Sequence, residues 1–287
     1  MSVINTNITS MIGQNNLRSS QSMLAQAQER LSSGLRINSA SDDAAGQAIA
    51  NKMTAQIKGM DQASRNASDG ISLVQTMEGG LDQVNDNLQR IRELAVQGAN
   101  DTNTADDRAA IETEINERLA EIDRVAGSNN FNGTNLLNVA SGATTALNIQ
   151  VGANTDSEDV ITVNRINATV SGLGLSGGGM SGSTFTAGPA SGAHSNFQSL
   201  IDSVDAAVKS LDTNRATLGA TLNRFDSVID NLATTTTNLS EARSRIEDAD
   251  YAVEVSNMTR ANILQQAGTS MLAQANQTPQ SVLSLLG

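Results

Sequence analysis

The sequence predicts a mainly α-helical chain in which long helices pack side by side as a bundle or coiled coil, with a small β-hairpin region. Apolar residues recur at steps of three and four over long stretches, as on one face of a helix. The 287 residues include four Phe, one Tyr and no Trp, so aliphatic side chains and Met must build the core, as in packed helices. Only two prolines, Pro189 and Pro279, limit helix formation.

The first long helix is expected over residues 45–100. At about 1.5 Å per residue it would be roughly 80 Å long, which predicts a rod rather than a globule. Its apolar stripe has the spacing of a coiled coil. The stripe comprises Ile49, Met53, Ile57, Met60, Ala63, Ala67, Ile71, Val74, Met77, Leu81, Val84, Leu88, Ile91 and Ala95.

Two further helices carry similar stripes, which together favour a helical bundle. One begins at Thr104, which resembles a capping box with Asp107 three residues later, and ends near Gly127. The other is expected at about 196–240. The stripes are Ile111, Ile115, Leu119, Ile122 and Ala126 in the first of these, and Phe197, Leu200, Val204, Leu211, Leu218, Phe225, Ile229, Leu232 and Leu239 in the second.

Between these two helices the apolar pattern changes to a period of two. Asn132-Gly133 is a turn signal, and residues 147–151 and 161–163 alternate apolar with polar side chains. We expect one or two β-hairpins here, packed on the end of the rod. The Gly-, Ser- and Thr-rich stretch 166–195 is expected to be a short variable surface loop that adds little to the core.

The two ends, residues 3–33 and 250–275, are predicted helices with thin apolar stripes. Gly34 indicates the end of the first, and Pro279 lies beyond the second. Ordering a residue costs ~1–2 kcal/mol and apolar burial returns ~25 cal/mol per Å², so each residue must bury on the order of 60 Å². Helices with such narrow apolar stripes cannot bury this area per residue alone, so we expect the ends to fold only among copies of the chain. The residues assigned to assembly are Ile4, Ile8, Leu17, Leu24, Leu31, Val255, Leu264, Met271 and Leu272.

Composition and charge argue against several kinds of partner. The formal net charge of −12 disfavours nucleic acid, whose phosphates are bound by Lys and Arg. No stretch approaches the ~20 apolar residues of a membrane span. Residues 1–13 lack the charged and apolar regions of a cleavable signal peptide. The absence of Cys excludes disulfides and thiolate metal sites.

The sequence offers no constellation for catalysis, a metal or a cofactor. His194, the only histidine, is expected to be a solvated loop residue without a partner ligand. The acidic pairs Asp42-Asp43, Asp106-Asp107, and Asp248 with Asp250 lie near predicted helix starts, where carboxylates stabilise free N–H groups. The G-x-G-x-x-G match at 172–177 lacks the following helix that a dinucleotide site requires.

Long strings near both ends resemble the signatures of bacterial flagellin. Residues 29–46 read Glu-Arg-Leu-Ser-Ser-Gly-Leu-Arg-Ile-Asn-Ser-Ala-Ser-Asp-Asp-Ala-Ala-Gly and resemble the N-terminal signature. Residues 244–251, Ser-Arg-Ile-Glu-Asp-Ala-Asp-Tyr, and 263–276, Ile-Leu-Gln-Gln-Ala-Gly-Thr-Ser-Met-Leu-Ala-Gln-Ala-Asn, resemble the C-terminal one. The likeness covers roughly 1–165 and 196–287. The final Leu-Leu-Gly departs from the family, whose members more often end with a basic residue.

The resemblance implies a short flagellin, a structural subunit that self-assembles into the helical filament used for swimming. Residues 1–44 with 246–287 would pair as the coiled coil of the filament core. Residues 45–165 with 196–245 would form an outer helical rod with β-hairpins. Residues 166–195 would be the short loop where other members carry inserted outer domains.

The resemblance also implies partners and a route out of the cell. The partners are other copies of the chain, the hook-associated junction and cap proteins, and an export chaperone at the C-terminal segment. Secretion would pass through the flagellum's own channel to the extracellular filament, without a cleaved signal peptide.

Receptor recognition is a further implication. Residues 89–96 resemble the stretch read by the vertebrate Toll-like flagellin receptor, and residues 29–50 resemble the segment sensed by the plant flagellin receptor kinase. The same stretch can instead serve packing, because Leu88, Ile91 and Ala95 belong to the apolar stripe and their polar neighbours can face an adjacent subunit. The candidate contacts are Gln89, Arg90, Ile91, Leu94 and, from the neighbouring helix, Glu114.

Three other functions compete with this interpretation. A hook–filament junction protein shares similar ends but forms a thin adaptor ring, so extended homopolymers separate the two. A secreted immune-active or adhesive module would bind as a monomer without its ends. An enzyme is the weakest alternative, since no nucleophile–base constellation is present.

Overall fold

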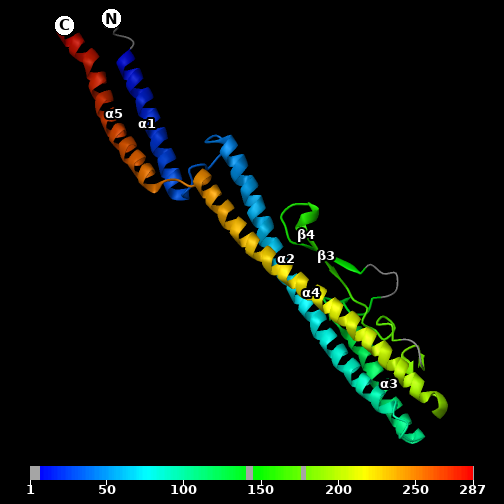
Figure 1. Cartoon of the computed structure of the whole chain (residues 1–287). Coiled ribbons are helices and arrows are strands. Elements are labelled where there is room, and N and C mark those ends of the chain that lie inside the picture. Colours follow the sequence, from blue (N-terminus) through cyan, green and yellow to red (C-terminus); the bar gives the residue numbers. More distant parts are fainter. Residues whose placement is uncertain (1–6, 140–144, 176–178, 287) are drawn as a thin grey trace. The chain divides into compact units, whose positions relative to one another are not determined.

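The computed structural model describes residues 7–139, 145–175 and 179–286 and confirms a mainly helical fold (Figure 1). Within these ranges the helices are α1 (Ile8–Ser33), α2 (Ala44–Gly98), α3 (Ala105–Ser128), α4 (Ala190–Glu247) and α5 (Tyr251–Leu286). The strands form antiparallel hairpins: β1 (Asn130–Phe131) with β2 (Thr134–Asn135), β3 (Ala146–Gln150) with β4 (Val160–Asn164), and β5 (Met180–Ser181) with β6 (Thr184–Phe185). A 3₁₀ turn, η1 (Ser157–Asp159), precedes β4.

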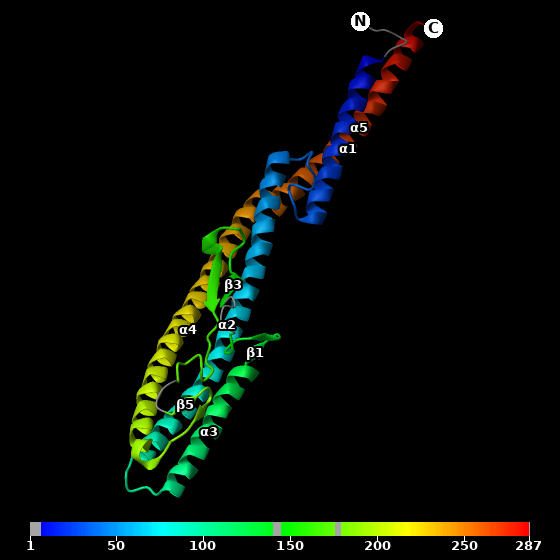
Figure 2. The ribbon, with the colours of Figure 1, turned by 90° about the vertical axis from the view of Figure 1, so that its right-hand side faces the viewer.

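The chain divides into two compact units whose boundaries fall inside α2 and α4. The first unit contains residues 1–57 and 236–287, and the second contains residues 58–235. In the second unit α2 and α4 run antiparallel, with Arg92 Nε 2.6 Å from Asp205 Oδ1 and Arg215 Nη2 2.6 Å from Asp82 Oδ1. α3 lies beside α2 in the same unit (Figure 2).

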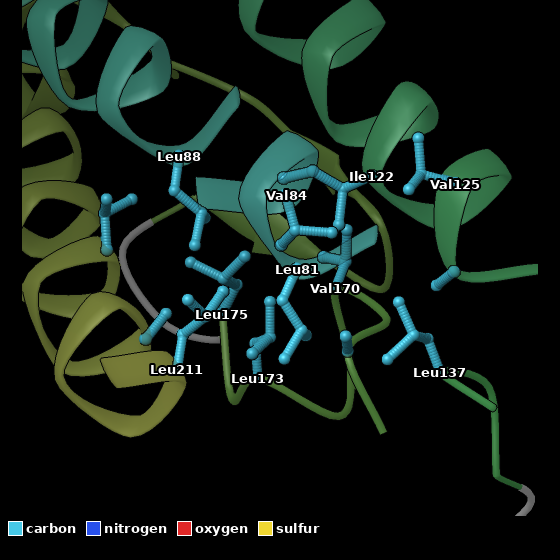
Figure 3. Close-up of a cluster of buried hydrophobic side chains, with 14 of the residues drawn as sticks. Leu81, Val84, Leu88, Ile122, Val125, Leu137, Val170, Leu173, Leu175 and Leu211 are labelled. Carbon is cyan, nitrogen blue, oxygen red and sulfur yellow. The ribbon is translucent and has the colours of Figure 1, made fainter. Parts of the chain in front are cut away.

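The core of the second unit is aliphatic, as the composition predicted. Leu81, Val84 and Leu88 of α2 meet Ile122 of α3 and Leu211 of α4 in one buried cluster (Figure 3). The predicted stripe of α2 is buried from Met60 onward except for the half-buried Ile71, whereas Ile49 is 48% exposed. All five stripe residues predicted for α3 are buried.

Glycines let two aromatic rings approach α2 closely. A β-carbon at Gly70 would lie 2.7 Å from Cζ of Phe225, and one at Gly98 would lie 2.5 Å from the ring of Phe197. Both rings come from α4 and are fully buried. Phe197 also packs against Phe185, with ring centroids 5.0 Å apart.

The segment 166–187 contributes to the core, so the expectation that it adds little is wrong. Val170, Leu175 and Phe185 are at most 1% exposed and belong to the main buried cluster. Polar side chains of α3 form hydrogen bonds with the backbone of this segment. Asn116 exchanges two hydrogen bonds with the main chain of Phe185, at 2.7 and 3.0 Å, and Asp123 Oδ1 accepts from the amide of Val170 at 2.9 Å.

The β1–β2 and β3–β4 hairpins appear where the Asn-Gly turn and the alternation predicted them, whereas β5–β6 lies in the stretch expected to be a loop. Asn132 and Gly133 have φ values of 49° and 79°, which a two-residue turn of type I′ requires. Ile149 pairs with Ile161, and Leu147 pairs with Val163. The β3–β4 hairpin lies along α2 rather than at the end of the helices, where it was expected from the sequence. Asn66 lies in the interior of α2, and its Nδ2 donates to the carbonyl of Gln150 in β3 at 3.0 Å.

Helix ends follow the capping signals with two corrections. The Thr104–Asp107 capping box and the left-handed Gly34 at the end of α1 are confirmed. α4 starts at Ala190, because the Pro189 carbonyl accepts its first helical bonds. His194 is therefore an exposed helical residue, not a loop residue, with Nδ1 2.7 Å from the Ala99 carbonyl oxygen. The second correction concerns α5, which continues through Pro279 to Leu286.

Candidate assembly surface

α1 and α5 form an antiparallel pair within the first unit (Figures 1 and 2). Near the C-terminal end of α1, Arg30 Nη1 lies 3.3 Å from Glu254 Oε1, close to the start of α5. At the opposite end of the pair, Ser10 Oγ donates to Asn276 Oδ1 at 2.9 Å. The first and last helices of the chain therefore contact each other along their length, although 224 to 268 positions separate hydrogen-bonded partners.

Leucine side chains pack onto glycines of the facing helix at two places in this pair. A β-carbon at Gly13 of α1 would lie 3.4 Å from Cδ1 of Leu272 of α5. The reciprocal contact has the same distance, between a β-carbon at Gly268 and Cδ1 of Leu17. The missing side chains let the two helices approach at these points.

Asn7 connects the start of α1 with the interior of α5. Its Oδ1 accepts from the amide of Ser10 at 3.0 Å and thereby caps α1. Its Nδ2 donates to the carbonyl oxygen of Ala275 at 2.7 Å. In a regular helix this carbonyl would accept from residue 279, but Pro279 has no N–H. Asn7 thus satisfies a carbonyl group that the proline leaves without a helical partner.

The two segments next to the pair are joined by backbone hydrogen bonds. The amide of Arg36 donates to the Glu247 carbonyl at 2.7 Å, and the amide of Ala249 donates to the Gly34 carbonyl at 2.9 Å. Asp42 orders the remaining part of the first segment, because hydrogen bonds from the backbone and hydroxyl of Ser39 hold its carboxylate in place. The same bonds lower the pKa of Asp42 from its ordinary value.

Much of the apolar surface of this helix pair remains uncovered. The described side chains of α1 that are buried are only Ser10, Ser20 and Ala27. Among the described residues, nine of the eleven exposed large apolar side chains lie on α1 or α5. These nine are Ile8, Met11, Ile12 and Met23 on α1, and Tyr251, Val253, Ile263, Leu264 and Met271 on α5.

A groove of about 650 Å³ runs between the two helices. Ile12 and Met23 line it from α1, and Leu264 and Met271 line it from α5. The other lining residues are small or uncharged polar residues, including Gly13 and Gly268. The groove can accept apolar side chains without burying a charge.

The predicted assembly residues lie on this pair wherever they fall among the described residues. Ile8, Leu264 and Met271 are 59%, 43% and 67% exposed. Ile4 lies outside the described residues. The remaining ones, half-buried, are Leu17, Leu24, Leu31, Val255 and Leu272. Six exposed apolar residues of the pair were not among the predicted assembly residues: Met11, Ile12, Met23, Tyr251, Val253 and Ile263.

The receptor candidates separate into surface and core residues. Gln89 and Arg90 are exposed, and Arg90 Nη2 lies 2.9 Å from the half-buried Glu114. Ile91 and Leu94 are 0% and 2% exposed, so their side chains pack inside the chain rather than on its surface. Their spacing places them on the buried side of α2, in the main cluster.

The described ranges offer neither a metal site nor a helix suited to crossing a membrane. No group of three or more His, Cys, Asp or Glu residues there is placed to hold a metal ion. Nor does any helix in those ranges combine the length and apolar character that crossing a membrane requires.

Family models match most of the chain, and alignments with individual relatives span nearly all of it. The family model of the bacterial flagellin N-terminal helical region matches residues 4–141, and that of the C-terminal helical region matches residues 201–286. Flagellin of Xenorhabdus nematophila is 49% identical over 315 aligned residues. Flagellins of Halalkalibacterium halodurans and Bacillus subtilis are 43% and 41% identical. Each alignment covers 99% of both chains.

Two solved structures align with part of the chain. The crystal structure of Bacillus cereus flagellin aligns with a TM-score of 0.48 at 29% identity, covering 62% of this chain and 94% of that one. A putative flagellar hook-associated protein from Vibrio parahaemolyticus aligns with a TM-score of 0.58 at 15% identity, covering 72% of this chain and all of the other. The second likeness concerns the fold alone.

Proposed function

The chain belongs to the bacterial flagellin family and is a structural subunit of the flagellar filament, and we propose that its α1–α5 pair supplies the main contacts between copies. The observation that carries this proposal is the concentration of exposed apolar side chains on these two helices. Monomeric soluble proteins rarely leave a large contiguous apolar patch uncovered. A groove lined from both helices by Ile12, Met23, Leu264 and Met271 adds a recess for the side chains of a neighbouring copy.

Energetics favour coupling between folding and assembly. Fully burying one large aliphatic side chain contributes about 1.5–3 kcal/mol. Within the isolated pair Ile8, Met11 and Ile12 remain more than half exposed, so they return little of this energy. Contacts among copies would recover it and offset the ordering of the helices. Because such contacts are heterologous and need not close into a ring, they extend the assembly into a helix.

The layers of the filament follow from this proposal. Residues 1–44 with 246–287 form the inner layer, residues 45–165 with 196–245 form the outer one, and residues 166–195 replace the larger inserted domains of longer flagellins. The division of the chain near residues 57 and 236 supports two layers, with a boundary displaced into α2 and α4. The outer helices would transmit torque along the filament.

Partners other than the chain itself are proposed from the family and from exposure. An export chaperone would cover the apolar side chains of α5, such as Val253 and Ile263, until secretion without a cleaved signal peptide. Junction and cap proteins would continue the α1–α5 packing at the filament ends. Gln89, Arg90 and Glu114 remain candidate contacts for the vertebrate receptor, and residues 29–50 for the plant receptor.

Seeded polymerisation tests the central proposal. The full chain should form long filaments visible by electron microscopy, whereas a chain lacking 1–44 and 246–287 should stay soluble. Two point variants of the full chain, Ile12→Gln and Leu264→Gln, keep helix propensity but remove apolar surface from the groove. Each should raise the critical concentration on the order of tenfold. Gln28→Ala is the control, since this exposed α1 residue does not line the groove.

Two outcomes would contradict the proposal. Thin rings without filaments would favour a hook–filament junction protein. Unchanged polymerisation of both groove variants would move the principal contacts away from the α1–α5 pair, even if filaments form.

A further inference from the structure

Methionine exposure differs sharply between the helix pair and the second unit's core. Met11, Met23 and Met271 are 57%, 45% and 67% exposed. Met60 and Met77 of α2 are 8% and 0% exposed. A single chain therefore carries thioethers that solvent can reach and thioethers that it cannot.

The exposed methionines occupy the surface assigned above to assembly. Met23 of α1 and Met271 of α5 line the same groove from opposite helices, together with Ile12 and Leu264. Met11 immediately precedes Ile12 on α1, and both side chains are more than half exposed. A chemical change at these sulfurs would alter the polarity of that surface directly.

We propose that Met11, Met23 and Met271 form an oxidisable site through which hydrogen peroxide blocks assembly of the free chain. This inference rests on the proposed role of the α1–α5 pair in assembly. The thioether sulfur attacks the peroxide, an S–O bond forms, and the O–O bond breaks. Sulfur loses two electrons, the peroxide is reduced, and a proton shift releases water. The product is methionine sulfoxide.

The physical consequence follows from the change in side-chain character. A sulfoxide is polar and accepts hydrogen bonds, whereas the thioether packs as a flexible apolar group. Burying the sulfoxide against apolar side chains of a neighbouring copy carries a desolvation cost that the thioether does not. Once a filament has formed, the same contacts exclude peroxide from the sulfurs. Oxidation therefore acts on chains before they assemble.

The first experiment maps oxidation with hydrogen peroxide as the probe. Soluble full-length chain and preformed filaments receive the same dose, and peptide mass spectrometry measures the gain of one oxygen at each methionine. In the soluble chain Met11, Met23 and Met271 should oxidise on the order of tenfold faster than Met77, the internal buried control. In filaments this difference should disappear. Equal rates at all four methionines of the soluble chain would overturn the proposal.

The second experiment measures the effect on assembly. Peroxide-treated chain should show a critical concentration raised on the order of tenfold, and methionine sulfoxide reductases A and B together should reverse the change. The triple variant Met11→Leu, Met23→Leu, Met271→Leu is compared with its own untreated sample and should lose far less polymerisation on treatment. Met77→Leu is the matched control and should remain as sensitive as the original chain.

The outcomes separate this inference from the proposed function. If untreated chain does not polymerise, the proposed function fails. If untreated chain polymerises and fully oxidised chain polymerises equally well, the function stands and the oxidisable site is wrong. Persistence of the block after reductase treatment would also overturn it, because the damage would then lie outside methionine.

Discussion

The ring of Phe225 on α4 fills the space beside Gly70 of α2, so that a β-carbon at residue 70 would lie 2.7 Å from the ring. Glycine inside a helix lowers stability relative to alanine. At residue 70, however, the missing side chain permits close packing of a buried aromatic ring. Nine residues later, Gly79 lies in the same helix, and beyond the adjacent backbone of that helix no heavy atom lies within 4 Å of the corresponding position. The two glycines form a matched pair for experiment.

Gly70→Ala should destabilise the chain by about 1–3 kcal/mol, because the new methyl group overpacks against the Phe225 ring. Gly79→Ala should stabilise it by about 0.5–1 kcal/mol through helix propensity alone. Urea unfolding of the soluble chain, followed by circular dichroism, measures both. Stabilisation of similar size in the two variants would show that the ring moves aside freely.

Asn7→Asp tests the link between Asn7 and the Ala275 carbonyl. Aspartate keeps the oxygen that caps α1 but has no N–H for this carbonyl, which lies 2.7 Å from Asn7 Nδ2. The loss of about 1 kcal/mol should raise the critical concentration about fivefold. Pro279→Ala should relieve the effect, since residue 279 would then supply the helical N–H. A double variant that is no better than Asn7→Asp would argue against this explanation.

Glu254→Gln should weaken the α1–α5 pair. The Glu254 side chain is 8% exposed, and its partner Arg30 is 23% exposed. Neutralising the carboxylate removes a charged hydrogen bond worth about 1–2 kcal/mol, which corresponds to a critical concentration raised about five- to thirtyfold. Glu241→Gln is the control, because that side chain is 61% exposed in its ion pair with Arg245 and should contribute under about 0.5 kcal/mol.

The capping box of α3 predicts a pH dependence. Hydrogen bonds from the hydroxyl and then the backbone of Thr104 lower the pKa of Asp107. A lowered folded-state pKa means that the stabilisation is present above the unfolded pKa of about 3.9 and is lost as the pH falls through the folded value. Asp107→Ala should therefore reduce stability at pH 7, and the difference from the original chain should shrink on acidification below about pH 4.

Asp107→Asn separates titration from the hydrogen bond itself. Its amide oxygen can still accept from Thr104, but it does not titrate in this range. Urea unfolding measures the difference in free energy of unfolding between Asp107→Asn and Asp107→Ala. This difference should be the same at pH 7 and below about pH 4. A difference that grows on acidification would place the pH dependence in another group.

Regular elements were predictable because their signals are local. The Thr104–Asp107 box and the Asn132-Gly133 turn each depend on a few adjacent residues. The stripe from Val74 to Ala95 depends on periodicity, and the structure buries it. In a regular helix or strand, residues at a fixed spacing lie on the same face, which is why these predictions succeeded.

The features that the sequence did not predict depend on contacts between residues far apart in the chain. Val170 and Leu175 lie in an irregular segment and Phe185 lies in a strand of two residues, so no period links sequence position to direction. Asn116 and Asp123 of α3 hold the backbone of Phe185 and Val170. On the α1–α5 pair, spacing placed Leu264 and Met271 on the apolar stripe of α5. It could not reveal Asn7 with Ala275 or Arg30 with Glu254, because those pairs depend on the register of two helices far apart in the chain.

The sequence separation within the α1–α5 pair also delays its formation during synthesis. Arg30 meets a partner 224 positions later, and Asn7 meets one 268 positions later. A ribosome adding about 5–20 residues per second needs roughly ten to fifty seconds to produce that length of chain. For most of this interval α1 has been synthesised while α5 has not. The order of the helices therefore means that α1 and α5 can pair only when translation is nearly complete.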